Sequence, residues 1–194
     1  MDKVSYAIGM NIAANLKQSG VKTLDYQALS EGLKAVIEGT KAEIEPREAA
    51  QILNKFFSEL EEKNNQQNID DGKAFLAANA TRKEVVTLKS GLQYEVITEG
   101  NGPKPKATDT VSCHYHGTLI DGTVFDSSVR RGQPAEFPVN GVIKGWVEAL
   151  QMMSVGSKWK LYIPHDLAYG ARGAGESIAP YSTLIFEVEL LGIK

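Results

Sequence analysis

Apolar residues in the first part of the chain recur at the spacing of an α-helix. Between residues 4 and 16 they occupy every fourth position, which places them on one helical face. Gly20 is a suitable stop signal for this helix. A second helix is predicted to follow Asp25, a favourable N-cap, and to end before Gly39. The residues on the first face are Val4, Ile8, Ile12 and Leu16.

A third, much longer helix is predicted over residues 46–79. Pro46 suits its first position, where the missing N–H would have no helical partner anyway. Its first half has a strong apolar face that includes Phe56 and Phe57. Residues 62–68 are polar all round, which favours either a solvent-bridging helix or a break. Without a break, the helix would be roughly 50 Å long at about 1.5 Å per residue.

These helices are too few to close a core of their own. Two short helices and half of a third fall below the size at which a domain stabilises itself easily. If two copies pack or exchange their helices, Phe56 and Phe57 gain partners on both sides of the helix that carries them. We therefore predict a homodimer formed through residues 1 to about 60. The alternative is a monomer whose helices pack on its own C-terminal domain.

The second part of the chain has the pattern of β-strands separated by turns. The last strand alternates most clearly, with Phe186 and Val188 on one face and Glu187 on the other. The pair Asp121-Gly122 is expected to supply the positive backbone angles of a tight hairpin. One helical pattern, over residues 143–153, interrupts the strands. The predicted strands are residues 92–98, 110–119, 135–139, 158–163 and 183–191.

The two parts of the chain differ in how many turn-forming residues they contain. Residues 1–88 contain 5 Gly and 1 Pro, whereas residues 89–194 contain 13 Gly and 6 Pro. Because glycine and proline punctuate strands and disfavour helix interiors, we place a helical domain over residues 1–87 and a sheet-containing domain over residues 88–194. The expected fold class is α+β: a C-terminal antiparallel sheet wrapped on one short helix, preceded by an all-α domain with a long linking helix.

Charge and hydropathy argue against several classes of function. The net charge is −3, and neither part carries the basic stripe that nucleic acid would need. No run of about 18 apolar residues occurs, so no membrane span is expected. The first residues do not resemble a signal peptide, which favours the cytoplasm, or the periplasm if a leader had been removed. Cys113, the only cysteine, is expected to be a buried thiol.

Three short segments of the second part combine apolar side chains with single polar groups. They contribute the pair Phe125-Asp126, the residues Ile143 and Trp146, and Tyr169. Brought together by a fold, they would line a small apolar cup that holds one carboxylate and one phenol. Such a cup is typical of a binding pocket rather than of a nucleophilic active site. Ordinary core packing is the alternative for each aromatic residue taken singly.

Other candidate chemistry is weaker. His114 and His116 have the spacing of one strand face, but only His165 could join them, so no zinc site is expected. Residues 170–175 lack the Lys-Ser/Thr ending of a phosphate-binding loop. The serine pair at 127–128 does not lie in a nucleophile elbow.

Six motifs of the second part, taken in order, resemble the FKBP-type peptidyl-prolyl isomerases. The resemblance covers about residues 88–194. The helical extension is similar to that of the macrophage-infectivity-potentiator and bacterial FKBP subgroup, whose members dimerise through such helices. The motifs are His114-Tyr115-His116-Gly117, Asp121-Gly122-Thr123-Val124-Phe125-Asp126-Ser127-Ser128, Val142-Ile143-Lys144-Gly145-Trp146, Met153-Ser154-Val155-Gly156, Ala168-Tyr169-Gly170 and Phe186-Glu187-Val188-Glu189-Leu190-Leu191.

The resemblance implies a substrate and a site. The substrate would be a peptide bond preceding proline in an unfolded or proline-containing polypeptide. Trp146 would form the pocket floor, and Tyr169 would donate its hydroxyl to the substrate carbonyl. Asp126 would either orient its polar neighbours or face the twisting carbonyl carbon. The implied catalytic residues are Tyr169, Asp126, Phe125 and Trp146, and the implied substrate-binding residues are Tyr115, Val142, Ile143, Ile178, Phe186 and Arg131.

The implied reaction breaks no covalent bond. Rotation about the peptide bond crosses a barrier of about 18–20 kcal/mol and removes the amide resonance. A dry, apolar cup favours the twisted state, in which the charge separation of the amide is reduced. We expect no covalent intermediate, no metal and no cofactor. Macrolides such as rapamycin are candidate ligands, with affinity weakened by departures from the family pattern at His116, Ala135 and Ala179.

Two other interpretations of the chain stay open. In the first, it is a dimeric folding chaperone or peptide-binding module in which isomerase activity is incidental. In the second, it is a purely structural dimer with a degenerate pocket.

Overall fold

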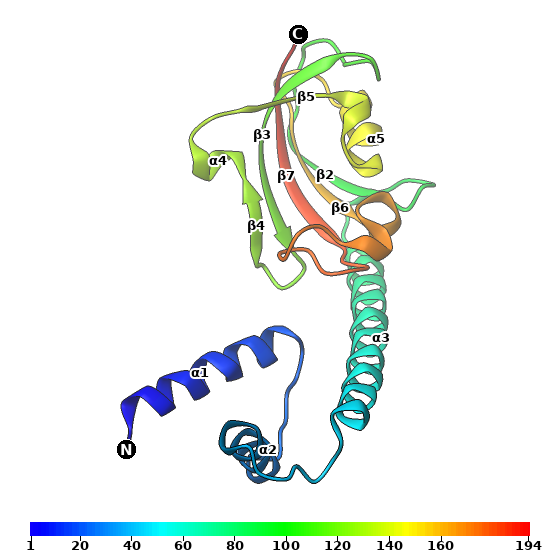
Figure 1. Ribbon diagram of the computed structural model, residues 1–194. Helices are drawn as coiled ribbons and strands as arrows, with labels where there is room; N and C mark the ends of the chain where they lie inside the picture. The colour runs from blue at the N-terminus through cyan, green and yellow to red at the C-terminus, as the bar shows by residue number, and fades with distance from the viewer. The chain divides into compact units, whose positions relative to one another are not determined.

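The computed structural model describes all 194 residues, and the chain divides into two compact units, Met1–Asn64 and Asn65–Lys194 (Figure 1). The division falls inside the helix α3 (Pro46–Asn79), which therefore contributes to both units. The domain boundary predicted from the composition, between residues 87 and 88, lies directly after β1 (Val86–Thr87), which is the first strand of the sheet. None of the helices combines the length and the apolar composition that a bilayer crossing requires.

The first unit contains α1 (Lys3–Gln18), α2 (Tyr26–Glu38) and the first half of α3. The predicted N-cap of α2 is confirmed, because the Asp25 carboxylate accepts from the backbone N–H groups of Gln27 and Ala28. Gly39 ends α2 in the left-handed conformation, with φ of +65°. Local sequence signals thus account for the limits of this helix.

The helices of the first unit bury almost no apolar surface within the chain. Neither α1 nor α2 contains a buried residue, and Val21 is the one core residue of this unit. The side chains of Val36 and Ile37 on α2 are each 81% exposed. The apolar faces predicted from the sequence are therefore present, and most of their side chains stay exposed within a single chain.

The helix α3 is continuous from Pro46 to Asn79, so the long linking helix is confirmed and the alternative of a break is wrong. Hydrogen bonds between side chains four residues apart support its polar middle. Gln66 donates to Asp70 at 2.9 Å and Gln67 donates to Asp71 at 2.8 Å. Such pairs stabilise an exposed helix by about 0.2–0.5 kcal/mol each.

The second unit is built on one antiparallel sheet in the order β1-β2-β6-β7-β3-β4, with β5 paired to β3. The five predicted strands are found within two residues of their expected limits. The short strands β1 and β4 were not predicted. The strands after β1 are β2 (Gln93–Thr98), β3 (Thr110–Leu119), β4 (Val124–Ser127), β5 (Ala135–Pro138), β6 (Lys158–Ile163) and β7 (Leu184–Ile193).

The predicted hairpin at Asp121-Gly122 joins β3 to β4, but the prediction for its backbone was wrong at Asp121. Only Gly122 has a positive φ, of +86°. The Asp121 carboxylate instead accepts from the N–H of Thr123 at 2.8 Å, and the pairing register shifts between Gly117 and Thr118. The hairpin is therefore a wider, bulged turn.

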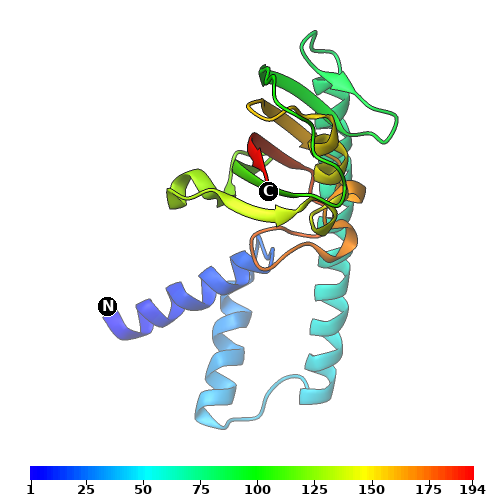
Figure 2. The same ribbon diagram turned by 90° about the horizontal axis from the view of Figure 1, so that it is seen from above.

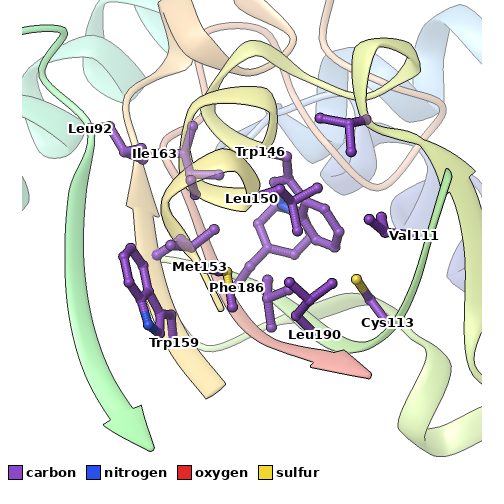
Figure 3. Close-up of a cluster of buried hydrophobic side chains, with 14 of the residues drawn as sticks. Leu92, Val111, Cys113, Trp146, Leu150, Met153, Trp159, Ile163, Phe186 and Leu190 are labelled. Atoms are coloured by element: carbon purple, nitrogen blue, oxygen red, sulfur yellow. The ribbon is translucent and has the colours of Figure 1, made fainter. Parts of the chain in front are cut away.

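The helix α5 (Lys144–Met152) lies against one face of the sheet, as Figures 1 and 2 show. Leu150 on this helix and Leu161 on β6 are fully buried in the shared core, part of which Figure 3 draws. Cys113 is also fully buried, and burial raises the pKa of its thiol to about 12, so the expectation of a buried thiol is confirmed. The short helix α4 (Ser128–Arg131) and three 3-10 turns, Val139–Gly141, His165–Leu167 and Gly170–Arg172, complete the unit.

The last turns of α3 pack on the sheet through aromatic and polar contacts. Side chains alternate along β6, so Tyr162 points away from Leu161 and the α5 core. The ring of Tyr162 lies 6.0 Å from that of Phe75 on α3. The buried Asn79 donates to Gln93 on β2 at 2.9 Å. These contacts fix the end of α3 to the sheet within the second unit.

Candidate functional site

A pocket of about 740 Å³ opens in the second unit at one end of α5. All the residues that the sequence resemblance assigned to the site line this pocket, except Arg131. They come from β3, from β4, from the two residues before α5, from α5 itself, from the segment between β6 and β7, and from β7. These parts of the chain are distant in sequence. The lining residues are Tyr115, Phe125, Asp126, Phe137, Gly141, Val142, Ile143, Trp146, Tyr169, Ala174, Gly175, Ser177, Ile178 and Phe186.

Trp146 is the centre of an aromatic cluster on which the pocket rests. It is 4% exposed, and its ring meets those of Tyr115, Phe137 and Phe186 edge to face, with centroids 5.2 to 5.4 Å apart. Edge-to-face contacts of this kind are worth about 0.5–1.5 kcal/mol each beyond burial. The indole Nε1–H is buried without an acceptor in the chain, an arrangement that native proteins usually avoid.

The absence of a side chain at Gly117 lets two aromatic walls approach β3 closely. A Cβ atom there would lie 2.7 Å from the Phe125 ring and 2.8 Å from the Phe186 ring. These two rings also meet edge to face, at 5.3 Å. Gly117 pairs with Phe186 across β7 and with Asp126 across β4. The glycine therefore sets the position of both walls.

Asp126 lies at the polar rim of the pocket, and its carboxylate is fully engaged. Tyr115 donates its hydroxyl to one oxygen. Arg131 on α4 and the backbone N–H of Ser127 donate to the other. Arg131 also donates to the Tyr115 hydroxyl at 2.8 Å, and its guanidinium lies 5.6 Å from the centre of that ring. Tyr115, Asp126 and Arg131 thus form a closed triangle, of which Arg131 is the one member that does not line the pocket.

The triangle keeps its charges at neutral pH. Burial alone raises the pKa of the Asp126 carboxyl, but hydrogen bonds from Tyr115 and Arg131 and the charge of Arg131 outweigh burial and hold that pKa below its usual value. Burial and the Asp126 hydrogen bond raise the pKa of the Tyr115 phenol. Asp126 is therefore ionised and Tyr115 protonated throughout the physiological range.

The short helix α4 holds the positively charged corner of the triangle. Its N-cap, Ser127, accepts from the N–H of Arg130 at 3.2 Å, and Gly132 ends it with φ of +71°. His116 contacts the Ser127 hydroxyl at 3.0 Å, and His114 contacts that of Ser128 at 3.1 Å. The two histidines therefore support the turn that carries Asp126 and Arg131, by contacts that sequence reasoning did not foresee.

The opposite wall is the segment between β6 and β7, where Tyr169 is 40% exposed and Ile178 is 6% exposed. Ala174 and Ile178 exchange backbone hydrogen bonds of 2.8 and 3.1 Å, which close the segment into a loop. Ala174, Gly175 and Ser177 of this loop line the pocket and were missed, because small residues carry no apolar periodicity.

Phe137 is the most consequential residue that was missed. It lies on β5, two positions after Ala135, so the two residues share one strand face. In this chain Phe137 contributes an aromatic ring to the same side and packs on Trp146 at 5.3 Å. Strand alternation was the signal that could have found it.

Comparisons with known proteins cover the whole chain. Residues 102–191 match the family model of FKBP-type peptidyl-prolyl cis-trans isomerases, and residues 1–96 match that of the domain amino terminal to them. The FKBP-type 22 kDa peptidyl-prolyl cis-trans isomerase of Escherichia coli is 48% identical over 98% of this chain and 94% of the relative. The outer membrane protein MIP of Legionella longbeachae is 42% identical over 100% of this chain and 85% of the relative.

Solved structures show the same two-part organisation. The crystal structure of FkpA from Escherichia coli matches 98% of this chain and 93% of its own chain, with a TM-score of 0.79 and 37% identity. The helical region, the antiparallel sheet and the short helix of the two chains therefore correspond over nearly their full length. From the fold, the pocket and these relatives together, the chain belongs to the FKBP-type peptidyl-prolyl cis-trans isomerases and carries the amino-terminal domain of that family.

Proposed function

We propose that the pocket floored by Trp146 binds a prolyl residue and lowers the barrier to rotation about the peptide bond that precedes it. The observation that carries this proposal is the composition of the pocket: aromatic and branched apolar walls, with Asp126 as the one ionised side chain among the lining residues. Such a surface accepts a five-membered ring but offers no activated nucleophile.

The proposed catalysis is non-covalent. Twisting the peptide bond removes its resonance, so the twisted state has less charge separation and is better tolerated by an apolar cup than the planar state. Tyr169, partly exposed at the pocket, is proposed to donate its hydroxyl to the substrate carbonyl. The N–H of Ile143, the N-cap residue of α5, is proposed to hold the peptide. A tenfold gain in rate needs only about 1.4 kcal/mol, so modest contributions suffice.

Of the two roles considered for Asp126, orientation of its neighbours is the better supported. Its oxygens already accept from Tyr115, Arg131 and Ser127. A carboxylate with these partners is held in place and has its charge compensated, so it is poorly suited to face a carbonyl carbon directly. We propose that Asp126 fixes Tyr115 as a wall of the pocket and Arg131 as its external support.

The test is the isomerisation of a proline-containing peptide and the refolding of a protein limited by proline isomerisation. Catalytic amounts of the protein should accelerate both. Tyr169→Phe and Trp146→Ala should each lower kcat/KM, the second more, because it removes the pocket floor. Gln151→Ala, on the exposed side of α5, is the matched control and should act as the unchanged protein. A refolding rate that the protein leaves unaltered would reject the proposal.

A second candidate function is supported by the exposed apolar faces of the first unit. We propose that residues 1 to about 60 form a homodimer, which could hold unfolded clients independently of the pocket. Val36 and Ile37 are the clearest support, since each is 81% exposed within one chain. If chaperone activity is separate, Tyr169→Phe and Asp126→Ala should leave suppression of aggregation unchanged.

We also propose ligands for the pocket and a cellular compartment for the protein. Unfolded and proline-containing polypeptides fit the pocket, and rapamycin is a candidate whose binding would quench Trp146 fluorescence once Trp159 is replaced. The cytoplasmic expectation gains no support from the relatives, whereas the periplasmic alternative is favoured by the one named an outer membrane protein. Subcellular fractionation distinguishes the two compartments.

A further inference from the structure

The long helix α3 directly contacts the loop that forms one wall of the pocket. Asn68 on α3 donates its side-chain N–H to the carbonyl oxygen of Pro180 at 2.9 Å. One turn further along the same face, the buried Gly72 lies against Thr183. Pro180 and Thr183 end the segment that begins at Tyr169. The helix α3, which does not line the pocket, therefore contacts the end of the loop that forms one pocket wall.

Two hydrogen bonds meet at one peptide group of the loop, one from Asn68 on α3 and one from within the loop itself. The oxygen of the peptide between Pro180 and Tyr181 accepts from Asn68. The N–H of the same peptide donates to the carbonyl of Gly170 at 2.8 Å. Gly170 directly follows Tyr169. The orientation of this one peptide thus ties α3 to the residue that carries the proposed hydroxyl donor.

The same peptide leads into a costly backbone conformation. Tyr181 has φ of +59° and is the only residue other than glycine with a positive φ. Such a conformation persists only when the surroundings hold it. The bonds at Gly170 and Asn68 support it, together with the contact of its ring with His165, at 5.2 Å between centroids. The N–H and the hydroxyl of Ser182 also donate to the carbonyl of Ala179, at 3.3 and 2.7 Å, and close the turn around Tyr181. Loss of the Asn68 bond should therefore loosen the loop.

The approach at Gly72 is close enough to exclude any side chain. A Cβ atom at this position would lie 2.4 Å from Oγ1 of Thr183 and 3.3 Å from its Cβ atom. Thr183 is 3% exposed and precedes β7, so it has little room to move. A larger residue at position 72 would push the helix and the loop apart.

The helix is the firm side of this contact. Beyond Gly72, the side chain of Asn79 donates to Gln93, and Gln93 donates in turn to the carbonyl of Leu76, both at 2.9 Å. Arg82, just after the helix, donates to the Tyr162 hydroxyl at 2.8 Å. The loop, in contrast, contains one 3-10 turn and a single β-bridge. Displacement at the contact would fall on the loop.

We propose that Asn68 and Gly72 are positioning residues for the substrate site, holding the loop so that Ile178 closes one wall and Tyr169 presents its hydroxyl. The inference rests on the proposed site. Both residues lie in the part of the chain that matches the amino-terminal domain of the family. The catalytic pocket therefore depends on that domain's last helix as well as on the sheet.

The first test compares Asn68→Ala with Gln66→Ala in the full chain. Both remove one side-chain amide from α3, but Gln66 bonds only to Asp70 on the same exposed helix. Asn68→Ala should lower kcat/KM for a proline-containing tetrapeptide about threefold to tenfold, mainly through KM. Hydrogen exchange at the amides of Tyr181 and Ile178 should accelerate, while amides of β6 and β7 stay protected. Gln66→Ala should change neither measurement.

The second test uses a steric change and its suppressor. Gly72→Ala should produce the same loss of kcat/KM and the same local exchange. Adding Thr183→Ala removes the closest clashing atom and should recover at least half of the lost activity. Recovery would show that the defect lies in the contact between helix and loop rather than in helix stability.

The possible results separate this inference from the proposed site. Wild-type kcat/KM and exchange in both Asn68→Ala and Gly72→Ala would overturn the positioning role. Faster exchange throughout the sheet would also overturn it, because the effect would then be global. If Tyr169→Phe and Ile178→Ala also leave kcat/KM unchanged, the proposed substrate site itself is wrong. Loss of activity in those two variants alone rejects only the role of α3.

Discussion

At the scale of single residues, the pocket depends on partners that fix each functional group. Asp126 is an example, since three donors determine where its carboxylate lies. Trp146 is another, because three aromatic rings surround it. Residue types suggested a carboxylate and an aromatic floor, but the partners that fix them come from distant segments. Two predictions belong at this scale.

Gly117→Ala is expected to disturb both aromatic walls at once. The added methyl group would collide with Phe125 and Phe186, and overpacking of this kind costs about 1–3 kcal/mol. Urea unfolding should show that loss of stability, and kcat/KM should fall at least tenfold, on the scale of about 1.4 kcal/mol per factor of ten. Gly192→Ala on β7 is the control, because nothing lies within 4 Å of a Cβ atom there. Equal behaviour of the two variants would contradict the prediction.

The pH dependence of activity should have an acid limb that depends on Asp126. Because the folded-state pKa of this carboxyl is lowered, its contribution to stability is present above its unfolded pKa of about 3.9 and is lost as pH falls through the folded value. Between about pH 5 and pH 8 the triangle should not titrate, since the pKa of Tyr115 is raised. The rate of peptide isomerisation should fall below about pH 4, and circular dichroism at each pH should show whether the protein is still folded. Its persistence in Asp126→Asn would assign it to another group.

At the scale of elements, local patterns located most helices and strands but not their contacts. The limits of α2 follow from Asp25 and Gly39, and the alternation along β7 identifies its buried face. The short strand β4 was missed because four residues carry too little periodicity to be recognised. The long helix α3 was predicted over residues 46–79, but its continuity through residues 62–68 was left open, since a polar stretch is compatible with a helix or a break.

The attachment of α3 to the sheet gives a prediction at this scale. Asn79 is 5% exposed, donates to Gln93 and accepts from Arg82. Asn79→Ala would leave the Gln93 oxygen buried without that donor, at a cost of about 1–3 kcal/mol. Urea unfolding followed by circular dichroism should detect the loss. Asn64→Ala, near the middle of α3, serves as the control. No difference between the two variants would argue that the attachment rests on packing alone.

At the scale of the whole molecule, the two units differ in how completely one chain stabilises them. The second unit has a continuous core that joins α5 to the sheet. The first unit has a single buried apolar residue, Val21, and apolar helix faces whose side chains are mostly exposed. Association is the simple way to remove this surface from water. The state of assembly is therefore the main property to measure.

The protein is expected to sediment as a dimer at micromolar concentration. Val36→Glu combined with Ile37→Glu should shift it to a monomer, because charges would then face any apolar partner helix. Lys34→Glu on the same helix is the control and should remain dimeric. Activity on a short peptide should survive in the monomer, since the pocket lies in the second unit. Sedimentation of the wild-type protein as a monomer would contradict the dimer hypothesis.

The sequence by itself determined the helical and strand-rich parts, the limits of the capped helices and the apolar character of the cup. These features depend on periodicity, caps and residue type, which act over a few neighbouring positions. Only the tertiary structure decided the triangle of Tyr115, Asp126 and Arg131, the place of Phe137 on Trp146, and the hold of Asn68 on Pro180. Each of these contacts joins segments whose meeting depends on strand pairing and helix packing, and no local pattern records that meeting.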